Sequence, residues 1–249
     1  MFPIGGEKMR FNVELLLDNE TIPKDKNRVI LSLIKHNFSS YDKNYYSELY
    51  EDTPYKMKSF TFALYMENCR FLREEIIIPG KKIILNYSTY DVGDGIMFYN
   101  AFLENKGLEY PIKNNSIKVN RIRLNKEKTI TENEAVYKTL SPISVREHFG
   151  DNKKTWYHSL NAAKGQEVFI NNLKYQLIDE FGEGRMLDIE EMEFEVLNNR
   201  EVKVKNYDIE VLGNICYLRI QAQPYILDYL YKAGIGSQRS TGFGMVDLV

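Results

Sequence analysis

Apolar residues alternate with polar ones from Met9 to Leu17, and this spacing predicts a first strand. Apolar residues then recur at helical spacing from Val29 to Ile34, which predicts a helix that ends near 36–40. The first half of the chain is expected to run strand, helix, strand, strand, helix, strand. The last four of these elements are predicted at 60–66, 82–89, 92–104 and 118–124.

The same order of elements is predicted a second time in the other half. The chain is therefore expected to be an α+β protein with two tandem ferredoxin-like (RRM-like) domains, each βαββαβ with an antiparallel sheet. We expect the domains to span 1–128 and 129–249. The predicted elements of the second half are a strand at 134–140, a helix at 166–181, strands at 189–197, 202–211 and 214–221, a helix at 224–232 and a terminal strand at 243–248.

The overall charge weighs mildly against a nucleic-acid partner, but the distribution of charge makes this less decisive. The chain has 249 residues, and 33 Lys and Arg against 35 Asp and Glu give a formal net charge of −2. Basic residues gather around the first helix and at 113–128, whereas acidic residues crowd 179–195. This segregation predicts either one basic face that binds along the phosphates of a nucleic acid or two ordinary solvated faces.

Several other classes of protein are not indicated. Two cysteines are too few for a disulfide framework or a cysteine-based zinc site, and no apolar run is long enough for a membrane span. We therefore expect a cytoplasmic protein without membrane contact. No cofactor and no metal site is predicted, because Asp91 and Asp94 fit a helix N-terminal cap better than a pair of metal ligands.

The most informative segment is a glycine-rich loop near the C-terminus. A helix precedes it and a strand follows, so it matches neither a dinucleotide-binding nor a P-loop motif. Glycines permit close backbone approach and polar side chains crowd between them, so the loop is predicted either to cradle phosphate or to be a flexible connection. The residues concerned are Gly234, Gly236, Ser237, Gln238, Arg239, Ser240, Thr241, Gly242 and Gly244.

Together with three other segments, this loop resembles a known family. The segments are 137–143 (YKTLSPI), 172–175 (NLKY) and 60–62 (FTF). They are similar to those of the CRISPR repeat-processing endoribonucleases, the sixth Cas family of the RAMP superfamily. The resemblance spans most of the chain. It implies an enzyme that cuts CRISPR precursor RNA within its repeats, without metal, and leaves a guide RNA.

The implied reaction is attack of a ribose 2′-hydroxyl on the adjacent phosphate, which gives a 2′,3′-cyclic phosphate and a 5′-hydroxyl. Histidine suits the proton transfers, and lysine or arginine suits the charge of the phosphorane. The family usually carries its histidine near the first helix, where this chain has His36. The expected catalytic residues are His36, Lys35, Tyr41 and Lys26, and the expected RNA contacts are Arg28, Lys232 and the loop residues Gly234, Gly236, Ser237, Gln238, Arg239, Ser240, Gly242 and Gly244.

Alternatives remain for these roles. His36 also fits a histidine stabilised by the dipole at the end of its helix. Many members of the family place the histidine later, where this chain has Tyr50 within 48–51. The dense tyrosines of 41–50 are expected to orient RNA or assist proton transfer, or else to pack or stack on bases. Farther along, the basic and aromatic segment 150–157 is expected either to hold a base against Trp156 or to be an exposed loop anchored by it.

Two functions therefore compete. The first is an endoribonuclease whose partner is CRISPR repeat RNA, and the second is a RAMP-type subunit that binds guide RNA in an effector complex without cutting it. An unrelated metabolic enzyme on the same scaffold is disfavoured by the glycine-rich loop. The sequence leaves open whether the protein forms a homodimer.

Overall fold

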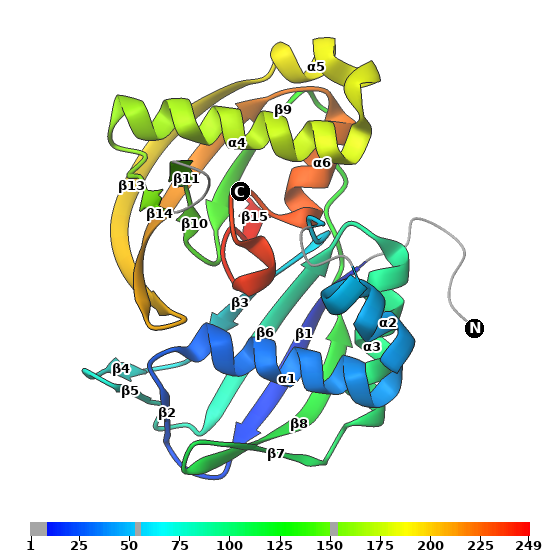
Figure 1. Ribbon diagram of the computed structural model, residues 1–249, viewed down its shortest axis with the longest axis vertical. Coiled ribbons are helices and arrows are strands. Elements are labelled where there is room, and N and C mark those ends of the chain that lie inside the picture. Colours follow the sequence, from blue (N-terminus) through cyan, green and yellow to red (C-terminus); the bar gives the residue numbers. More distant parts are fainter. Residues whose placement is uncertain (1–8, 53–55, 150–153) are drawn as a thin grey trace.

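The computed structural model describes residues 9–52, 56–149 and 154–249. The N-terminal half forms an antiparallel sheet in the order β3-β6-β1-β8-β7, and α1 crosses one face of it (Figure 1). A small sheet of β2, β5 and β4 lies beside it. The elements are β1 (Arg10–Leu17), β2 (Thr21–Pro23), α1 (Lys26–Tyr41), α2 (Lys43–Ser47), the short helix η1 (Glu48–Asp52), β3 (Phe60–Tyr65), β4 (Arg70–Phe71), β5 (Glu75–Ile77), β6 (Lys82–Thr89), α3 (Val92–Glu104), β7 (Glu109–Ile112) and β8 (Asn115–Leu124).

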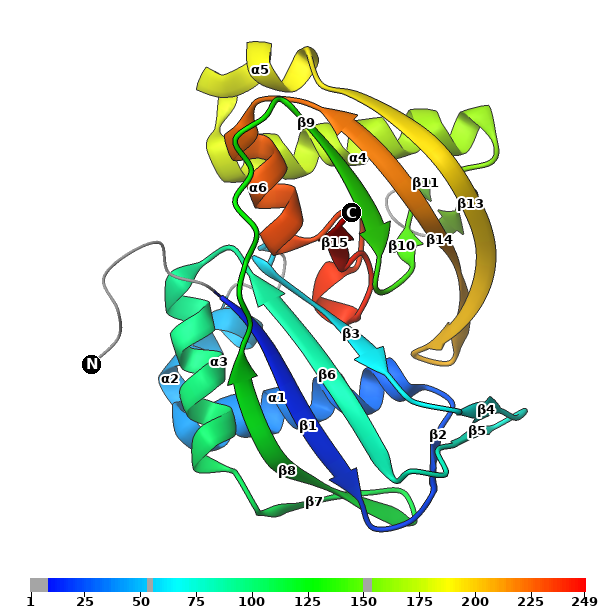
Figure 2. The same cartoon turned by 180° about the vertical axis from the view of Figure 1, so that it is seen from behind.

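The C-terminal half builds a second antiparallel sheet in which β13, β14, β9 and β15 are neighbours in that order. The helix α4 lies across one face of this sheet, and it faces the same side of the molecule as α1 does on the N-terminal sheet (Figure 1). In the reverse view both helices therefore lie behind their sheets (Figure 2). The elements are β9 (Glu134–Thr139), β10 (Ile143–Ser144), β11 (Arg146–Phe149), β12 (Lys154–Tyr157), α4 (Ala163–Phe181), η2 (Glu183–Arg185), α5 (Met186–Glu190), β13 (Glu193–Asn206), β14 (Ile209–Gln221), α6 (Pro224–Ala233), η3 (Arg239–Thr241) and β15 (Val246–Leu248).

The strand orders confirm the predicted fold class. In each half the four main strands lie in the order second, third, first, fourth, as β3-β6-β1-β8 and as β13-β14-β9-β15. This is the antiparallel arrangement of a βαββαβ unit, and it occurs twice. The alternation of β1 also appears as predicted, because Phe11, Val13 and Leu15 are at most 3% exposed while the residues between them are only half-buried. Two separate clusters of buried apolar residues form the cores.

One part of the second half differs from the sequence prediction. The strands expected at 189–197, 202–211 and 214–221 are a single long hairpin of β13 and β14, and Ile189 belongs to the short helix α5. Residues 198–201, between two of the expected strands, stay paired with β14 after an irregularity in register. The true turn lies at 207–208, where both residues have positive φ angles, 48° and 66°.

Two further predictions near the C-terminal sheet are corrected. The terminal strand begins at Val246 rather than Phe243, because Gly244 has a φ of 70°, which is not a strand conformation. The segment 154–157 is a strand paired with β11 rather than a loop, and Trp156 is 63% exposed, so its side chain lies largely in solvent. Residues 150–153 of the expected loop lie outside the described residues.

The two halves are joined by side chains that reach across to backbone carbonyls. Arg10 on β1 donates to the carbonyls of Tyr231 and Val246 at 3.1 and 2.8 Å. Ser88 on β6 donates to the carbonyl of Lys232 at 2.7 Å. Because the Arg10 side chain is buried and needs these acceptors, it ties the C-terminal end of the chain to the first sheet.

Candidate functional site

The glycine-rich loop is tightly folded and packed against the first sheet. All four of its glycines have positive φ angles, between 70° and 88°. A Cβ atom at Gly244 would collide with the Ile235 carbonyl oxygen, and one at Gly242 would lie 2.7 Å from the Phe62 ring. The glycines are therefore required by close packing. This packing does not fit the flexible connection that was one of the two expectations for the loop.

Polar residues of the first half hold this loop by its carbonyl groups. Asn27, buried on α1, donates to the carbonyls of Thr241 and Gly242 at 3.0 and 3.2 Å. Thr61 on β3 donates to the Phe243 carbonyl at 2.8 Å. The loop is consequently a joint between the two halves, and residues 236–241 border an open groove on its outer side.

Two of the expected RNA contacts are engaged inside the protein. Arg239 is only 6% exposed, and its guanidinium donates to the Ala233 carbonyl at 3.0 Å. Lys232 forms ion pairs with Asp228 at 2.9 Å and with Glu127 at 3.7 Å. Both cations already have partners within the protein, and their role as RNA contacts stays a prediction.

The groove beside the loop has a volume of about 420 Å³, and we call it the loop groove. It is formed by the loop, the segment before β3, α4, β11 and the tip of the β13–β14 hairpin. Among the described residues that line it there is no Asp or Glu, although the chain has 35 of them. Such a lining favours an anionic ligand. Its cationic and aromatic members are Lys56, Lys58, Arg146, Tyr175, Tyr207 and the inward-facing Arg239.

Lys58 of the loop groove also belongs to a group in which two lysines flank a tyrosine. The Lys35 and Lys58 ammonium groups lie 4.4 and 5.3 Å from the centre of the Tyr50 ring. Burial lowers the pKa of Lys35, and burial followed by the charge of Lys35 lowers the pKa of Lys58. The Tyr50 hydroxyl is buried and has no hydrogen-bond partner within the described part of the chain. We call these three residues the lysine cluster.

A half-buried carboxylate fixes the helices next to the lysine cluster. Asp94 on α3 accepts hydrogen bonds from the hydroxyls of Tyr45 and Ser59, each at 2.6 Å. Burial raises the pKa of Asp94, and these two donors oppose that rise. The contact ties α2, which leads into the helical turn carrying Tyr50, to α3. The expected N-terminal cap is confirmed, because the Asp91 side chain accepts from the Asp94 amide at 2.9 Å.

His36 lies on a different side of α1 from Lys35. Its ring is 5.0 Å from the ring of Tyr110, whose hydroxyl is 2.6 Å from the Ser32 hydroxyl. Consecutive residues of an α-helix are rotated by about 100°, so Lys35 and His36 point in different directions. Lys35 instead meets Tyr50 from the helical turn after α2.

The other two expected catalytic residues, Tyr41 and Lys26, lie at opposite ends of α1. Tyr41 is the last residue of α1 and Lys26 the first, so the helix places them roughly 22 Å apart along its axis. The Lys26 ammonium donates to the Asn27 side chain at 2.9 Å, and burial lowers the pKa of Lys26 to about 8. The structure therefore does not bring His36, Lys35, Tyr41 and Lys26 to one point.

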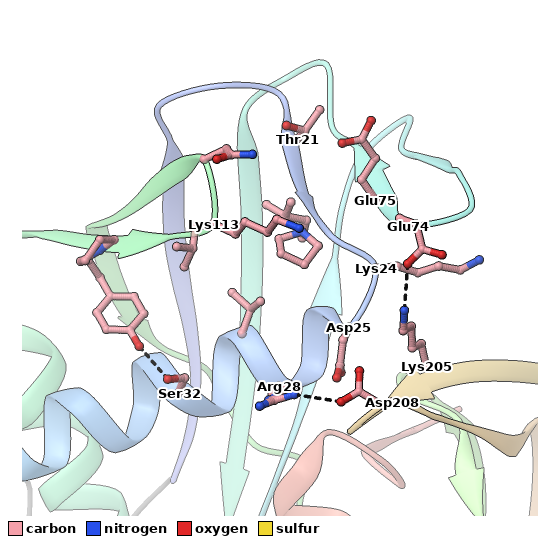
Figure 3. A pocket seen from close by; sticks show the side chains of 17 residues that line it. Thr21, Lys24, Asp25, Arg28, Ser32, Glu74, Glu75, Lys113, Lys205 and Asp208 are labelled. Carbon is pink, nitrogen blue, oxygen red and sulfur yellow. Dashed lines mark hydrogen bonds and ion pairs between the residues drawn. The ribbon is translucent and has the colours of Figure 1, made fainter.

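A second and larger hollow, of about 720 Å³, lies beside the N-terminal part of α1 (Figure 3). It holds Arg28, an expected RNA contact, which pairs with Asp208 at 3.4 Å. Lys205 pairs with Glu74 at 3.0 Å. Charges balance in this hollow, unlike in the loop groove, so it favours an anion less. The charged residues that line it are Lys24, Arg28, Lys113 and Lys205 with Asp25, Glu74, Glu75 and Asp208.

Sequence reasoning did not assign a role to the residues that face the loop across its groove. Lys58, Arg146 and Tyr207 come from three segments that are far apart in the chain and meet only in the folded protein. Tyr175 offered a signal, because it belongs to the family-like segment 172–175. The structure places it on α4 and leaves it 70% exposed.

Comparison with known proteins agrees with this fold. The family model described as "CRISPR associated protein Cas6, C-terminal" matches residues 125–248. A protein of Methanocaldococcus jannaschii, "CRISPR-associated endoribonuclease Cas6 1", is 29% identical over 253 residues, covering 96% of this chain and 92% of that protein. Residues 125–248 are a Cas6 C-terminal domain.

Two solved structures share the fold of this chain. One, described as a Cas6-related gene product from Pyrococcus furiosus, has a TM-score of 0.81 at 21% identity and covers 98% of this chain and 99% of that one. The other, described as a RAMP protein binding different RNA substrates, has a TM-score of 0.81 at 23% identity and covers 97% and 99%. No described helix is long and apolar enough to cross a membrane.

Proposed function

We propose that this protein is a Cas6 family endoribonuclease that cleaves CRISPR precursor RNA within its repeats and so produces guide RNAs. The observation that carries the proposal is the loop groove, a cationic and aromatic surface whose described lining contains no carboxylate. RNA supplies the matching chemistry, because its phosphates pair with Lys58 and Arg146 while its bases stack on tyrosine rings.

The proposed reaction is transesterification without a metal ion. The 2′-oxygen forms a bond to the adjacent phosphorus, and the bond from that phosphorus to the 5′-oxygen breaks. One group accepts the 2′-hydroxyl proton and another donates a proton to the leaving 5′-oxygen. The products are a 2′,3′-cyclic phosphate and a 5′-hydroxyl. Lys35 and Lys58 suit the negative charge that develops on the phosphorane oxygens.

The geometry supports two positions for the scissile phosphate. We favour the lysine cluster, because Lys58 belongs both to the cluster and to the loop groove. There the lowered pKa of Lys35 makes this lysine suited to proton transfer. The alternative position is next to His36, whose imidazole suits the same role and whose neighbours include Tyr110.

A set of matched variants separates these positions. We expect Lys35→Ala and Lys58→Ala to slow single-turnover cleavage of repeat RNA by about 100-fold or more, the range seen when a proton-transfer or charge-stabilising group is lost. We expect His36→Ala, which changes the next residue of the same helix, to stay within a few-fold of the unmodified protein. The opposite pattern would place the reaction at His36.

A second function is favoured by one specific observation. The histidines make other contacts, with His36 against Tyr110, His148 bonded to Thr155 and His158 bonded to Glu147. A protein without an imidazole at the lysine cluster fits a RAMP-type subunit that holds guide RNA in an effector complex. Such a protein would protect repeat RNA and leave it uncut, so analysis of the RNA ends distinguishes the two functions.

A further inference from the structure

We propose that the loop groove binds RNA as a single strand, with bases stacked on Tyr175 and Tyr207, and excludes the base-paired form. The proposal rests on the proposed function, in that it takes the ligand of the groove to be RNA. It adds the form of RNA that the groove accepts and the residues that select it.

The two tyrosines share the groove but come from different elements. Tyr175 lies on α4 and is 70% exposed, and Tyr207 lies at the turn of the β13–β14 hairpin and is 47% exposed. The Arg28 guanidinium lies over the Tyr207 ring at 5.3 Å, which supports the ring next to the groove. Both rings therefore offer an aromatic surface to a ligand.

The size and lining of the groove favour unpaired nucleotides. The open groove has a volume of about 420 Å³, which matches roughly one or two nucleotides, whereas a double helix has a diameter on the order of 20 Å. In a duplex the base faces are covered by neighbouring bases, so they are unable to stack on side chains. In a single strand every base has a free face.

The charges that line the groove suit a phosphate backbone. Lys58 and Arg146 lie in the same groove, and its described lining contains no carboxylate to repel phosphates. The loop adds polar groups through Ser237 and Ser240. Stacking on tyrosine tolerates any base, so selection at this groove depends on strandedness rather than on sequence.

The test measures the affinity of the full chain for two RNAs. One is an unstructured repeat RNA, and the other is the same RNA annealed to its complement. The variants are Tyr175→Ala and Tyr207→Ala, with Tyr175→Phe and Tyr207→Phe to restore the rings. The control is Phe71→Ala on β4, an aromatic residue that is 57% exposed and does not line the groove.

We expect each alanine variant to bind the single strand about 5- to 150-fold more weakly, because each loses one base-stacking surface. The phenylalanine variants and Phe71→Ala are expected to stay within about 3-fold of the unmodified protein. Binding of the duplex is expected to be weak and unchanged in all variants. A 2-aminopurine base in the single strand is expected to be quenched on binding and to lose this quenching in the alanine variants.

The two proposals fail in different ways. If the unmodified protein binds no repeat RNA, the proposed function fails and the single-strand inference fails with it. If the protein binds repeat RNA but the alanine variants bind it equally well, only the inference is overturned. Equal losses on the single strand and the duplex would also overturn the inference, because the tyrosines would then not select unpaired bases.

Discussion

At the residue scale, neighbouring positions in the sequence have unlike surroundings. Lys35 and His36 were both expected at one catalytic centre, but the helix turns them apart, Lys35 toward Tyr50 and His36 toward Tyr110. A sequence shows that these residues lie on one helix. It does not show which neighbours each side chain meets, because those neighbours come from segments that fold next to α1.

The glycines of the loop give the first prediction. Gly244→Ala is expected to lower the free energy of unfolding by about 2–4 kcal/mol, because its φ is 70° and the new Cβ would meet the Ile235 carbonyl oxygen. Gly184→Ala is the control, since nothing lies within 4 Å of a Cβ there, and a change below about 0.5 kcal/mol is expected. Chemical denaturation measures both. Equal effects would contradict the packing role of the loop.

Lys26 gives a prediction on pH. Its pKa is about 8 in the folded protein and near 10.5 when unfolded, so the folded state is disfavoured when this lysine must carry its charge. Lys26→Met is therefore expected to raise the free energy of unfolding below pH 8 by roughly 1–3 kcal/mol. The gain should shrink as the pH rises from 8 to 10.5. Denaturation at several pH values measures it, and Lys43→Met, at the exposed start of α2, serves as the control.

A gain for Lys26→Met that stays constant from about pH 6 to pH 10.5 would contradict this assignment. It would show that methionine stabilises the protein through packing alone and not through removal of the charge. The control variant changes the same charge at an exposed position and is expected to leave the pH dependence unaltered.

At the element scale, the pattern of apolar residues predicted most of the fold. The helices at 92–104 and 224–232 and the strand at 82–89 appear with bounds that agree to within one residue. The long hairpin did not follow from the pattern, because its strand is polar on both faces at 198–201. Gly213 lies between the expected strands 202–211 and 214–221. In the structure it makes room for Pro142, whose Cβ would lie 2.6 Å from a Cβ at position 213.

The loop element gives a prediction that separates a structural cation from a binding one. Arg239→Ala is expected to lower the free energy of unfolding by about 1–3 kcal/mol, because the buried Ala233 carbonyl loses its donor. Lys58→Ala is expected to leave stability nearly unchanged and to reduce the slope of log affinity for RNA against log salt by about 1. Titrations at several salt concentrations measure this slope. If Arg239→Ala instead reduces this slope and leaves the free energy of unfolding unchanged, Arg239 contacts phosphate.

At the scale of the whole molecule, the net charge of −2 conceals an uneven surface. The described lining of the loop groove has cations and no carboxylates, while the larger hollow beside α1 pairs its cations with acids. The sequence indicated segregated charge, with basic residues around the first helix, at 113–128 and at the glycine-rich loop. The groove was not predictable in this way, because its residues come from separate segments that the two halves bring together.

The most direct test is the incubation of purified protein with repeat RNA in excess EDTA, followed by mapping of the cut and analysis of the RNA ends. We expect one cut within each repeat, with a 2′,3′-cyclic phosphate on one product and a 5′-hydroxyl on the other. We also expect Lys35→Ala to bind the RNA and to cut it at least about 100-fold more slowly. Tight binding with no cut by the unmodified protein would contradict the proposed enzyme and identify an RNA-binding subunit.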